Sequence, residues 1–246
     1  MSSILPGLLI NFISTPEADS FNDISLVDKD GDKHSVSKII MAAHSNVLFK
    51  IFTQEQSNTI LHLPTVSGLS LVLILRWIES EELELNWTSV VDVLETAEFL
   101  DIPSVSNLCQ EWLMNRMDPN NVLGIWRFAK VHFLMTLERS SWRIITEQFS
   151  LIYKTEEFLQ LPSEILRIIL ISDELSCGEE EMWEGLLVWL GNKQELEEVN
   201  TLMETVRFGL LEPDFYMRRV KTNPLFQDIA PKVDEVKVIK FSSIEV

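Results

Sequence analysis

The segment Asp118-Pro-Asn-Asn-Val-Leu-Gly-Ile-Trp-Arg-Phe-Ala-Lys130 decides the fold class of the second half of this 246-residue chain. A capping aspartate followed by proline is a typical helix start. The apolar residues that follow share one helix face: Val122, Ile125, Trp126 and Ala129. The segment therefore predicts a helix that begins at Asp118 and turns one face towards a core.

Further helix starts follow at short intervals. Helices are expected over 137–149, from Thr155, from Pro162, from Glu179, over 201–208 and over 213–221. Thr155 is expected to cap its helix, with two glutamates in the first turn, where the helix dipole favours negative charge. The expected inner faces are Ile165, Ile168 and Ile169 in one helix and Met182, Leu186, Trp189 and Leu190 in the next. Residues 118–222 are therefore predicted to form an all-helical domain.

The first part of the chain mixes strand and helix signals. Strands are expected over 23–27, 33–36 and 61–63, with an Asp-Gly turn between the first two. Helices are expected over 37–52, 67–78 and 87–100, and a last helix carries the apolar stripe Val105, Leu108, Cys109, Trp112 and Leu113. This stripe predicts a buried, structural Cys109. The pattern predicts an α+β domain over 1–117, a small sheet surrounded by helices, and a tail over 223–246 that is a strand or free from 233 onward.

The chain is strongly acidic. It has 20 Lys and Arg against 38 Asp and Glu, a net charge of −18. This charge repels nucleic-acid phosphates and anionic membranes, so neither is expected as a partner, and it favours a basic protein partner. The apolar run over 69–75 is far shorter than a membrane span, and the N-terminus lacks the cationic start of a secretory signal. A soluble protein of the cytoplasm or nucleus is expected, with Cys109 and Cys177 as reduced thiols.

The sequence contains no pattern typical of a catalytic or metal site. Asp28, Asp30 and Asp32 alternate in one loop, but a calcium loop from Asp28 would lack the glycine at position 6 and the glutamate at position 12. A solvated hairpin turn is expected there instead. The four histidines lack the i, i+4 spacing of a helical zinc site. We expect a non-catalytic protein without cofactor or metal. For Trp87 and Trp126, a binding surface is an alternative to the core.

Two families share motifs with the chain. Residues 21–116 resemble a BTB (POZ) domain through Phe21-Asn-Asp23-Ile, Lys38-Ile-Ile-Met-Ala-Ala-His-Ser45 and Glu95-Thr-Ala-Glu-Phe-Leu-Asp-Ile-Pro103. Residues 118–222 resemble the BACK domain of Kelch-like proteins. The matching segments are Leu123-Gly-Ile-Trp-Arg-Phe-Ala129, Glu157-Phe-Leu-Gln-Leu-Pro162, Ser172-Asp-Glu-Leu175 and Val206-Arg-Phe-Gly-Leu-Leu211. The chain is thus similar to the N-terminal half of a Kelch-like protein.

The resemblance implies partners. BTB domains of this kind form homodimers, partly by exchanging the N-terminal segment, which implies a dimer interface at Leu5, Leu8, Leu9, Phe12, Asp23 and Lys38. Asp23 and Lys38 are expected to form a buried pair whose loss costs about 3–5 kcal/mol. Kelch-like proteins bind cullin-3 through the BTB domain and the first BACK helices, and a propeller recruits the substrate protein for ubiquitination. The implied cullin-3 contacts are Leu48, Phe52, Gln56, Asn58, Asn121, Leu123 and Trp126.

The sequence departs from the family at the cullin-3 contact. The family carries a hydrophobic-x-Glu motif there, whereas this chain has Gln56-Ser57-Asn58. A polar side chain in an apolar socket must lose its water, which disfavours binding. No Kelch repeats follow residue 222, so the chain is either part of a longer protein or a BTB–BACK protein without a propeller. Three functions stay open: an adaptor of a cullin-3 ubiquitin ligase, a dimeric scaffold that has lost cullin-3 binding, and an architectural or transcription-linked BTB protein.

Overall fold

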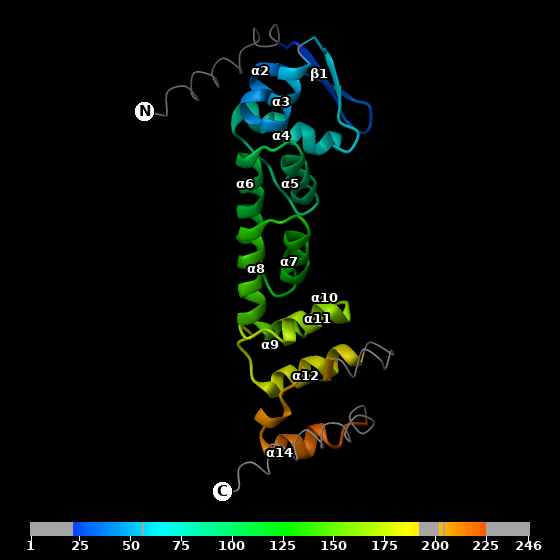
Figure 1. Cartoon of the computed structure of the whole chain (residues 1–246), viewed down its shortest axis with the longest axis vertical. Coiled ribbons are helices and arrows are strands. Elements are labelled where there is room, and N and C mark those ends of the chain that lie inside the picture. The colour runs from blue at the N-terminus through cyan, green and yellow to red at the C-terminus, as the bar shows by residue number, and fades with distance from the viewer. Residues whose placement is uncertain (1–21, 56, 192–201, 204, 225–246) are drawn as a thin grey trace, which may run out of the picture. The chain divides into compact units, whose positions relative to one another are not determined.

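The computed structural model describes residues 22–55, 57–191, 202–203 and 205–224 (Figure 1). The chain divides after Arg116 into two compact units. The first contains the sheet and helices α2 to α6, and the second contains the helices from α7 onward. Several sequence predictions lie outside the described residues: the dimer contacts Leu5, Leu8, Leu9 and Phe12, the contact Gln56, and the tail from 225.

The first unit is built on a three-stranded sheet with strand order β2-β1-β3. β1 (Ile24–Val27) pairs antiparallel with β2 (Lys33–Val36), so that Val27 lies opposite Lys33. It pairs parallel with β3 (Ile60–His62) on its other side. Since the central strand has buried apolar residues at 24, 26 and 27, it lies against the core of this unit.

The helices of the first unit are α2 (Lys38–His44), α3 (Asn46–Gln54), α4 (Gly68–Ser80), α5 (Val90–Phe99) and α6 (Pro103–Met114). The single helix expected over 37–52 is wrong, because Ser45 adopts an extended conformation and separates α2 from α3. The Ser45 hydroxyl accepts a hydrogen bond from the Leu48 amide at 2.9 Å and donates one to the Leu100 carbonyl. A serine that satisfies backbone groups in this way caps a new helix.

The apolar stripe of α6 is only partly buried. Cys109 is fully buried, which confirms its predicted place in the core. Leu108 is exposed, so the prediction that the whole stripe faces the core is wrong for this residue. The stripe spans more than one helix face, and α5 covers only part of it.

The second unit is helical. Its elements are α7 (Val122–Val131), α8 (Met135–Glu147), α9 (Phe149–Ile152), α10 (Glu156–Leu159), α11 (Ser163–Leu170), α12 (Glu179–Leu190), η2 (Phe208–Leu210), α14 (Pro213–Phe215) and η3 (Tyr216–Val220). The helix expected from Asp118 begins only at Val122. The Asp118 carboxylate instead accepts from the Asn120 amide at 2.7 Å, and Asn121 accepts from the Asp118 amide at 2.9 Å. These contacts close a turn before the helix.

The core of this unit matches most of the expected inner faces. Met182, Leu186, Trp189 and Leu190 are all buried, and Thr155 caps α10 by accepting from the Phe158 amide at 3.3 Å. The Trp189 indole donates to the Leu161 carbonyl at 3.0 Å and so joins α12 to the segment before α11. Ile168, expected inside, is exposed on α11. Ile165 and Ile169 cover the core without it.

Candidate partner-binding surfaces

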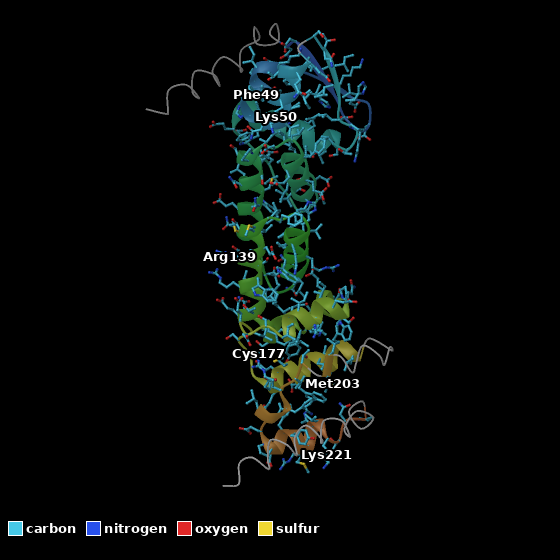
Figure 2. All side chains as sticks on the ribbon, in the orientation of Figure 1. Phe49, Lys50, Arg139, Cys177, Met203 and Lys221 are labelled. Atoms are coloured by element: carbon cyan, nitrogen blue, oxygen red, sulfur yellow. The ribbon has the colours of Figure 1, made fainter. Side chains whose placement is uncertain are left out.

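Helix α3 presents a different face to solvent from the one expected. Leu48 and Phe52 lie one turn apart and both point into the core, where they are buried. Their side chains are therefore not available to a partner in this fold. Phe49 is 56% exposed, and Lys50 follows it on the outer side of the helix (Figure 2). The i, i+4 spacing of Leu48 and Phe52 is typical of residues on a buried helix face. Sequence reasoning did not identify Phe49 as the exposed residue of this helix.

The segment after α3 is exposed. Asn58 is exposed, and its side-chain amide donates to the Glu55 carboxylate. The nearby Ile60 is also exposed, at the start of β3. The predicted contact Asn58 therefore lies on the surface, but with its amide already bound to a carboxylate of the same loop.

A groove of about 470 Å³ lies in the second unit, on helices α7, α8 and α11. Its lining residues are Trp126, Lys130, Met135, Glu138, Arg139, Trp142, Ile168 and Glu174. Of the predicted contacts, Trp126 lines this groove although it is almost completely buried. Leu123 is buried in the core, and Asn121 is half-buried in the turn before α7. The groove thus contains one of the three predicted BACK contacts.

Two indole rings shape the groove. The centroids of Trp126 and Trp142 are 5.1 Å apart, and the Lys130 ammonium lies 4.9 Å from the Trp126 centroid. The Trp142 indole donates to the Glu174 carboxylate at 2.6 Å. An apolar base bordered by charges of both signs suits a segment of another protein, because aromatic rings supply contact area and the border supplies polar partners.

The turn between α7 and α8 adds exposed apolar side chains beside the groove. Val131, Phe133 and Met135 are all strongly exposed, and Met135 lines the groove itself. Phe133 has a φ of 57°, in the left-handed region that side chains other than glycine rarely adopt. Sequence reasoning missed this turn, because no glycine, asparagine or proline marks it.

The predicted dimer contacts Asp23 and Lys38 meet at the start of α2. The Asp23 carboxylate accepts from the backbone amide of Lys38 at 2.8 Å. Within one chain Asp23 is exposed and Lys38 is half-buried. Lys38 is the first residue of α2, so the carboxylate satisfies an amide that has no partner within the helix. Ile39, the next residue, is 80% exposed.

Family models match both units of the chain. The BTB/POZ domain model matches residues 12–116, and the BACK model, described as "BTB And C-terminal Kelch", matches residues 122–221. This chain is a BTB–BACK protein. The order of the two domains is that of the N-terminal part of Kelch-like proteins, as the motifs indicated.

Curated relatives of this BTB–BACK protein are Kelch-like proteins. Kelch-like protein 13 of Mus musculus is 29% identical over 206 residues, which cover 81% of this chain and 32% of the relative. Kelch-like protein 24 of Homo sapiens is 25% identical over 233 residues, which cover 92% of this chain and 39% of the relative. The chain spans about a third of the length of these relatives. The solved BTB domain of human gigaxonin is 29% identical and covers 44% of this chain and 87% of its own, with a TM-score of 0.38.

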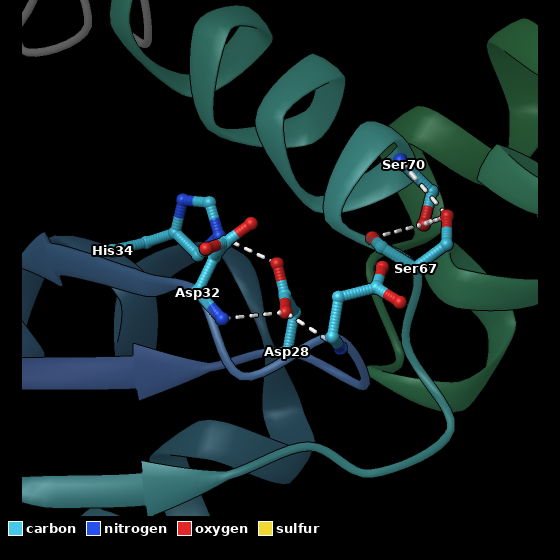
Figure 3. Close-up of polar contacts among 6 residues, drawn as sticks. Asp28, Asp32, His34, Ser67 and Ser70 are labelled. Carbon is cyan, nitrogen blue, oxygen red and sulfur yellow. Dashed lines mark hydrogen bonds and ion pairs between the residues drawn. The ribbon is translucent and has the colours of Figure 1, made fainter.

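A buried carboxylate organises the hairpin of the BTB domain (Figure 3). Asp28 accepts from the amides of Asp30 at 2.9 Å and Asp32 at 3.0 Å, and its other oxygen lies 2.9 Å from His34 Nε2. The prediction of a solvated turn is therefore wrong for Asp28. Backbone amides of the same turn and His34, rather than water, bind its carboxylate. The His34 hydrogen bond holds the pKa of Asp28 below its ordinary value, against the opposing effect of burial. The cluster is structural.

Neither cysteine of the BTB–BACK chain has the environment of a reactive thiol, since Cys109 is buried and Cys177 is half-buried. Burial raises the pKa of both the Cys109 and Cys177 thiols to about 12, so both stay protonated and are poor nucleophiles. Among residues 22–55, 57–191, 202–203 and 205–224, no group of three or more His, Cys, Asp or Glu could hold a metal ion. Within those same ranges, none of the helices has the length and apolar character needed to cross a bilayer.

Proposed function

We propose that this chain is a dimeric, non-catalytic substrate adaptor of a cullin-3 ubiquitin ligase in the cytoplasm or nucleus. The observation that carries the proposal is the BTB domain followed directly by a BACK domain. Kelch-like proteins have the same order of domains, and the resemblance to them implies the adaptor role. The chain spans about a third of the length of these relatives, and the proposal assigns no substrate-binding residues to it.

Two surfaces support a contact with cullin-3, one in each domain. In the BTB domain, the exposed Phe49 takes the place of the expected Leu48 and Phe52. In the BACK domain, the groove offers the half-buried ring of Trp142 and the exposed side chain of Met135. Large aromatic side chains at a surface supply much of the free energy of protein association. We therefore propose Phe49 and the groove as the contacts, together with Asn58 and the turn at Asn121.

The proposed homodimer finds support at the start of α2. Ile39 is 80% exposed, and it directly follows the Asp23–Lys38 contact. A large aliphatic side chain this exposed gains free energy when a second surface covers it. We propose that Ile39, Asp23 and Lys38 lie in the dimer interface, with the N-terminal residues Leu5, Leu8, Leu9 and Phe12 on the partner side.

Titration calorimetry with the cullin-3 N-terminal region tests the adaptor proposal. We expect binding in the micromolar range or tighter, and a loss of at least about tenfold in affinity, or 1.4 kcal/mol, for Phe49→Ala. Leu69→Ala is the matched control, because Leu69 is equally exposed in the BTB domain but lies on α4. No detectable binding at about 50 µM would contradict the proposal.

A dimeric scaffold that has lost cullin-3 binding is the second candidate. Two observations favour it: the polar Gln56-Ser57-Asn58 in place of the family motif, and the side-chain contact of Asn58 with Glu55. Gln56→Met restores an apolar side chain at the first motif position. If the chain is a scaffold of this kind, wild type does not bind cullin-3 whereas Gln56→Met does, which calorimetry distinguishes directly.

A further inference from the structure

The α5–α6 hairpin of the BTB domain carries a row of apolar side chains at its surface. Trp87, just before α5, is 52% exposed, Val91 in the first turn of α5 is 37% exposed, and Leu108 on α6 is 38% exposed. Trp112, one turn after Leu108, is half-buried. We call these four residues the α5–α6 seam. Soluble proteins rarely leave several large apolar side chains exposed together unless the surface binds something.

Contacts between the two helices hold the seam in place. The Trp87 ring meets the Trp112 ring edge to face, with centroids 4.8 Å apart, and the Arg116 guanidinium lies 4.1 Å from the Trp112 centroid. Further along, the Ser106 hydroxyl donates to the Glu98 carboxylate and ties α6 to α5. An aromatic side chain that is already fixed loses little conformational entropy when a partner covers it. Trp87 is therefore suited to anchor a partner.

The charged side chains of the hairpin are acidic, apart from Arg116, which lies over the Trp112 ring. Residues 77–115 contain no Lys, Arg or His, and their nine acidic residues supply −9 of the net −18: Glu79, Glu81, Glu82, Glu84, Asp92, Glu95, Glu98, Asp101 and Glu111. Eight of these nine side chains are exposed, and Asp101 is half-buried. The seam is thus an apolar row on a hairpin whose charged side chains, Arg116 apart, are all acidic. Such a surface attracts cations and repels anions over several ångströms.

We propose that the α5–α6 seam binds a cationic amphipathic helix of a partner protein. The apolar face of that helix covers Trp87, Val91 and Leu108, and its Lys and Arg side chains pair with the surrounding carboxylates. Anchors at i, i+3 or i+4, and i+7 match a row that follows the helices of the hairpin. A second copy of this chain does not fit, because its own seam carries the same negative charge, and nucleic acid or anionic lipid is repelled.

The seam is separate from the surfaces proposed for cullin-3. It contains no residue of α3 and none of the BACK groove. The proposal therefore stands or fails independently of the adaptor function. It gives the BTB domain a second partner, distinguished by positive charge.

The test uses the full chain and a dye-labelled synthetic helix with leucines on one face and lysines on the other. Fluorescence anisotropy measures binding of this peptide and of a charge-reversed peptide with glutamate for each lysine. We expect only the lysine peptide to bind. Trp87→Ser with Leu108→Ser should weaken its binding at least tenfold, whereas Trp87→Phe should keep it within about threefold, because the ring is retained. Ile60→Ser with Leu69→Ser, two exposed apolar residues elsewhere in the BTB domain, is the control and should bind as wild type.

Hydrogen exchange of the wild-type chain gives a second readout that needs no variant. The lysine peptide should protect amides at 87–95 and 105–115 and leave those of α3 unchanged. Equal binding by the seam variant and wild type would show attraction by general negative charge and overturn the proposal. Absence of protection at the seam would overturn it as well, even if the seam variant failed to fold.

Discussion

Among single residues, Asp28 links three parts of the BTB domain. Its carboxylate closes the β1–β2 turn through two backbone amides and contacts His34 on β2. It also lies against the start of α4, where a Cβ on Gly68 would come within 2.6 Å of its Oδ2 atom. Glycine at position 68 is therefore required by the close approach of a fixed side chain.

Gly68→Ala should destabilise the protein by about 1–3 kcal/mol, because the added methyl group displaces a carboxylate held by His34. The gain from alanine in a helix, at most about 1 kcal/mol, is smaller. Gly209→Ala is the control, since no atom lies within 4 Å of its Cβ position. Thermal unfolding followed by circular dichroism measures both. A Gly68→Ala protein that melts at or above the wild-type temperature would contradict the packing described.

Asp28 also predicts a pH dependence. Its pKa is lower in the folded protein than its ordinary value of 3.8, first through the hydrogen bond from His34. As pH falls, Asp28 is therefore protonated in the unfolded chain before it is protonated in the folded chain. The stabilisation from its carboxylate is present above about pH 3.8 and is lost as pH falls through the pKa of the folded protein. Asp28→Asn should lower stability near neutral pH and flatten the loss in acid. Asp30→Asn, in the same turn but exposed, is the matched control in melting experiments.

The first amides of helices in this chain are capped either by the residue just before the helix or by a residue farther away in the sequence. α3 is capped by Ser45 and α10 by Thr155, whereas the first amide of α2 is satisfied by Asp23 from the segment before β1. Each unsatisfied amide at a helix start weakens that helix. The ends of the elements therefore depend on tertiary contacts.

Asp23→Ala should destabilise the protein by about 0.5–2 kcal/mol, the range for loss of a helix cap. This range applies because the Asp23 carboxylate is exposed within one chain and accepts from a backbone amide. Asp23→Asn keeps an acceptor oxygen and should cost less than Asp23→Ala. Urea denaturation at neutral pH separates the two. An equal or larger loss for Asp23→Asn would show that the charge, rather than the cap, is what matters.

The Trp189 indole predicts a second difference between matched variants. Trp189→Phe leaves the buried Leu161 carbonyl without its donor and should cost about 1–3 kcal/mol, in addition to lost packing. Trp142→Phe removes a hydrogen bond to the exposed Glu174, which water replaces, so its cost should be smaller. If Trp189→Phe and Trp142→Phe lower the melting temperature equally, the larger contribution predicted for the buried hydrogen bond between Trp189 and Leu161 is contradicted.

Much of the architecture could be predicted from sequence, because it depends on local patterns. Three local signals each predicted an element correctly: the alternation in 23–36 predicted strands, the cap at Thr155 predicted α10, and the apolar spacing of 182–190 predicted α12. Element ends could not be predicted where a distant group decides them: Ser45 ends a helix through Leu100, and Asp118 closes a turn instead of starting a helix. The surface residues Phe49, Leu108 and Phe133 were missed, because only the packed structure shows which apolar side chains remain exposed.

For the whole molecule, each unit has its own core and carries its own candidate surfaces. The BTB domain contributes α3, the start of α2 and the α5–α6 seam, and the BACK domain contributes the groove on α7, α8 and α11. None of these surfaces has the chemistry of an active site, whereas all of them expose large apolar side chains. These exposed apolar side chains are the basis for the proposed action through bound proteins.

Light scattering during size-exclusion chromatography, with and without the cullin-3 N-terminal region, tests this central claim most directly. Alone, the chain should have a mass of about twice 28.4 kDa, and with the cullin-3 region it should elute as a complex heavier by two copies of that region. A mass of 28.4 kDa alone, or a dimer whose mass does not change when cullin-3 is added, would contradict the adaptor proposal.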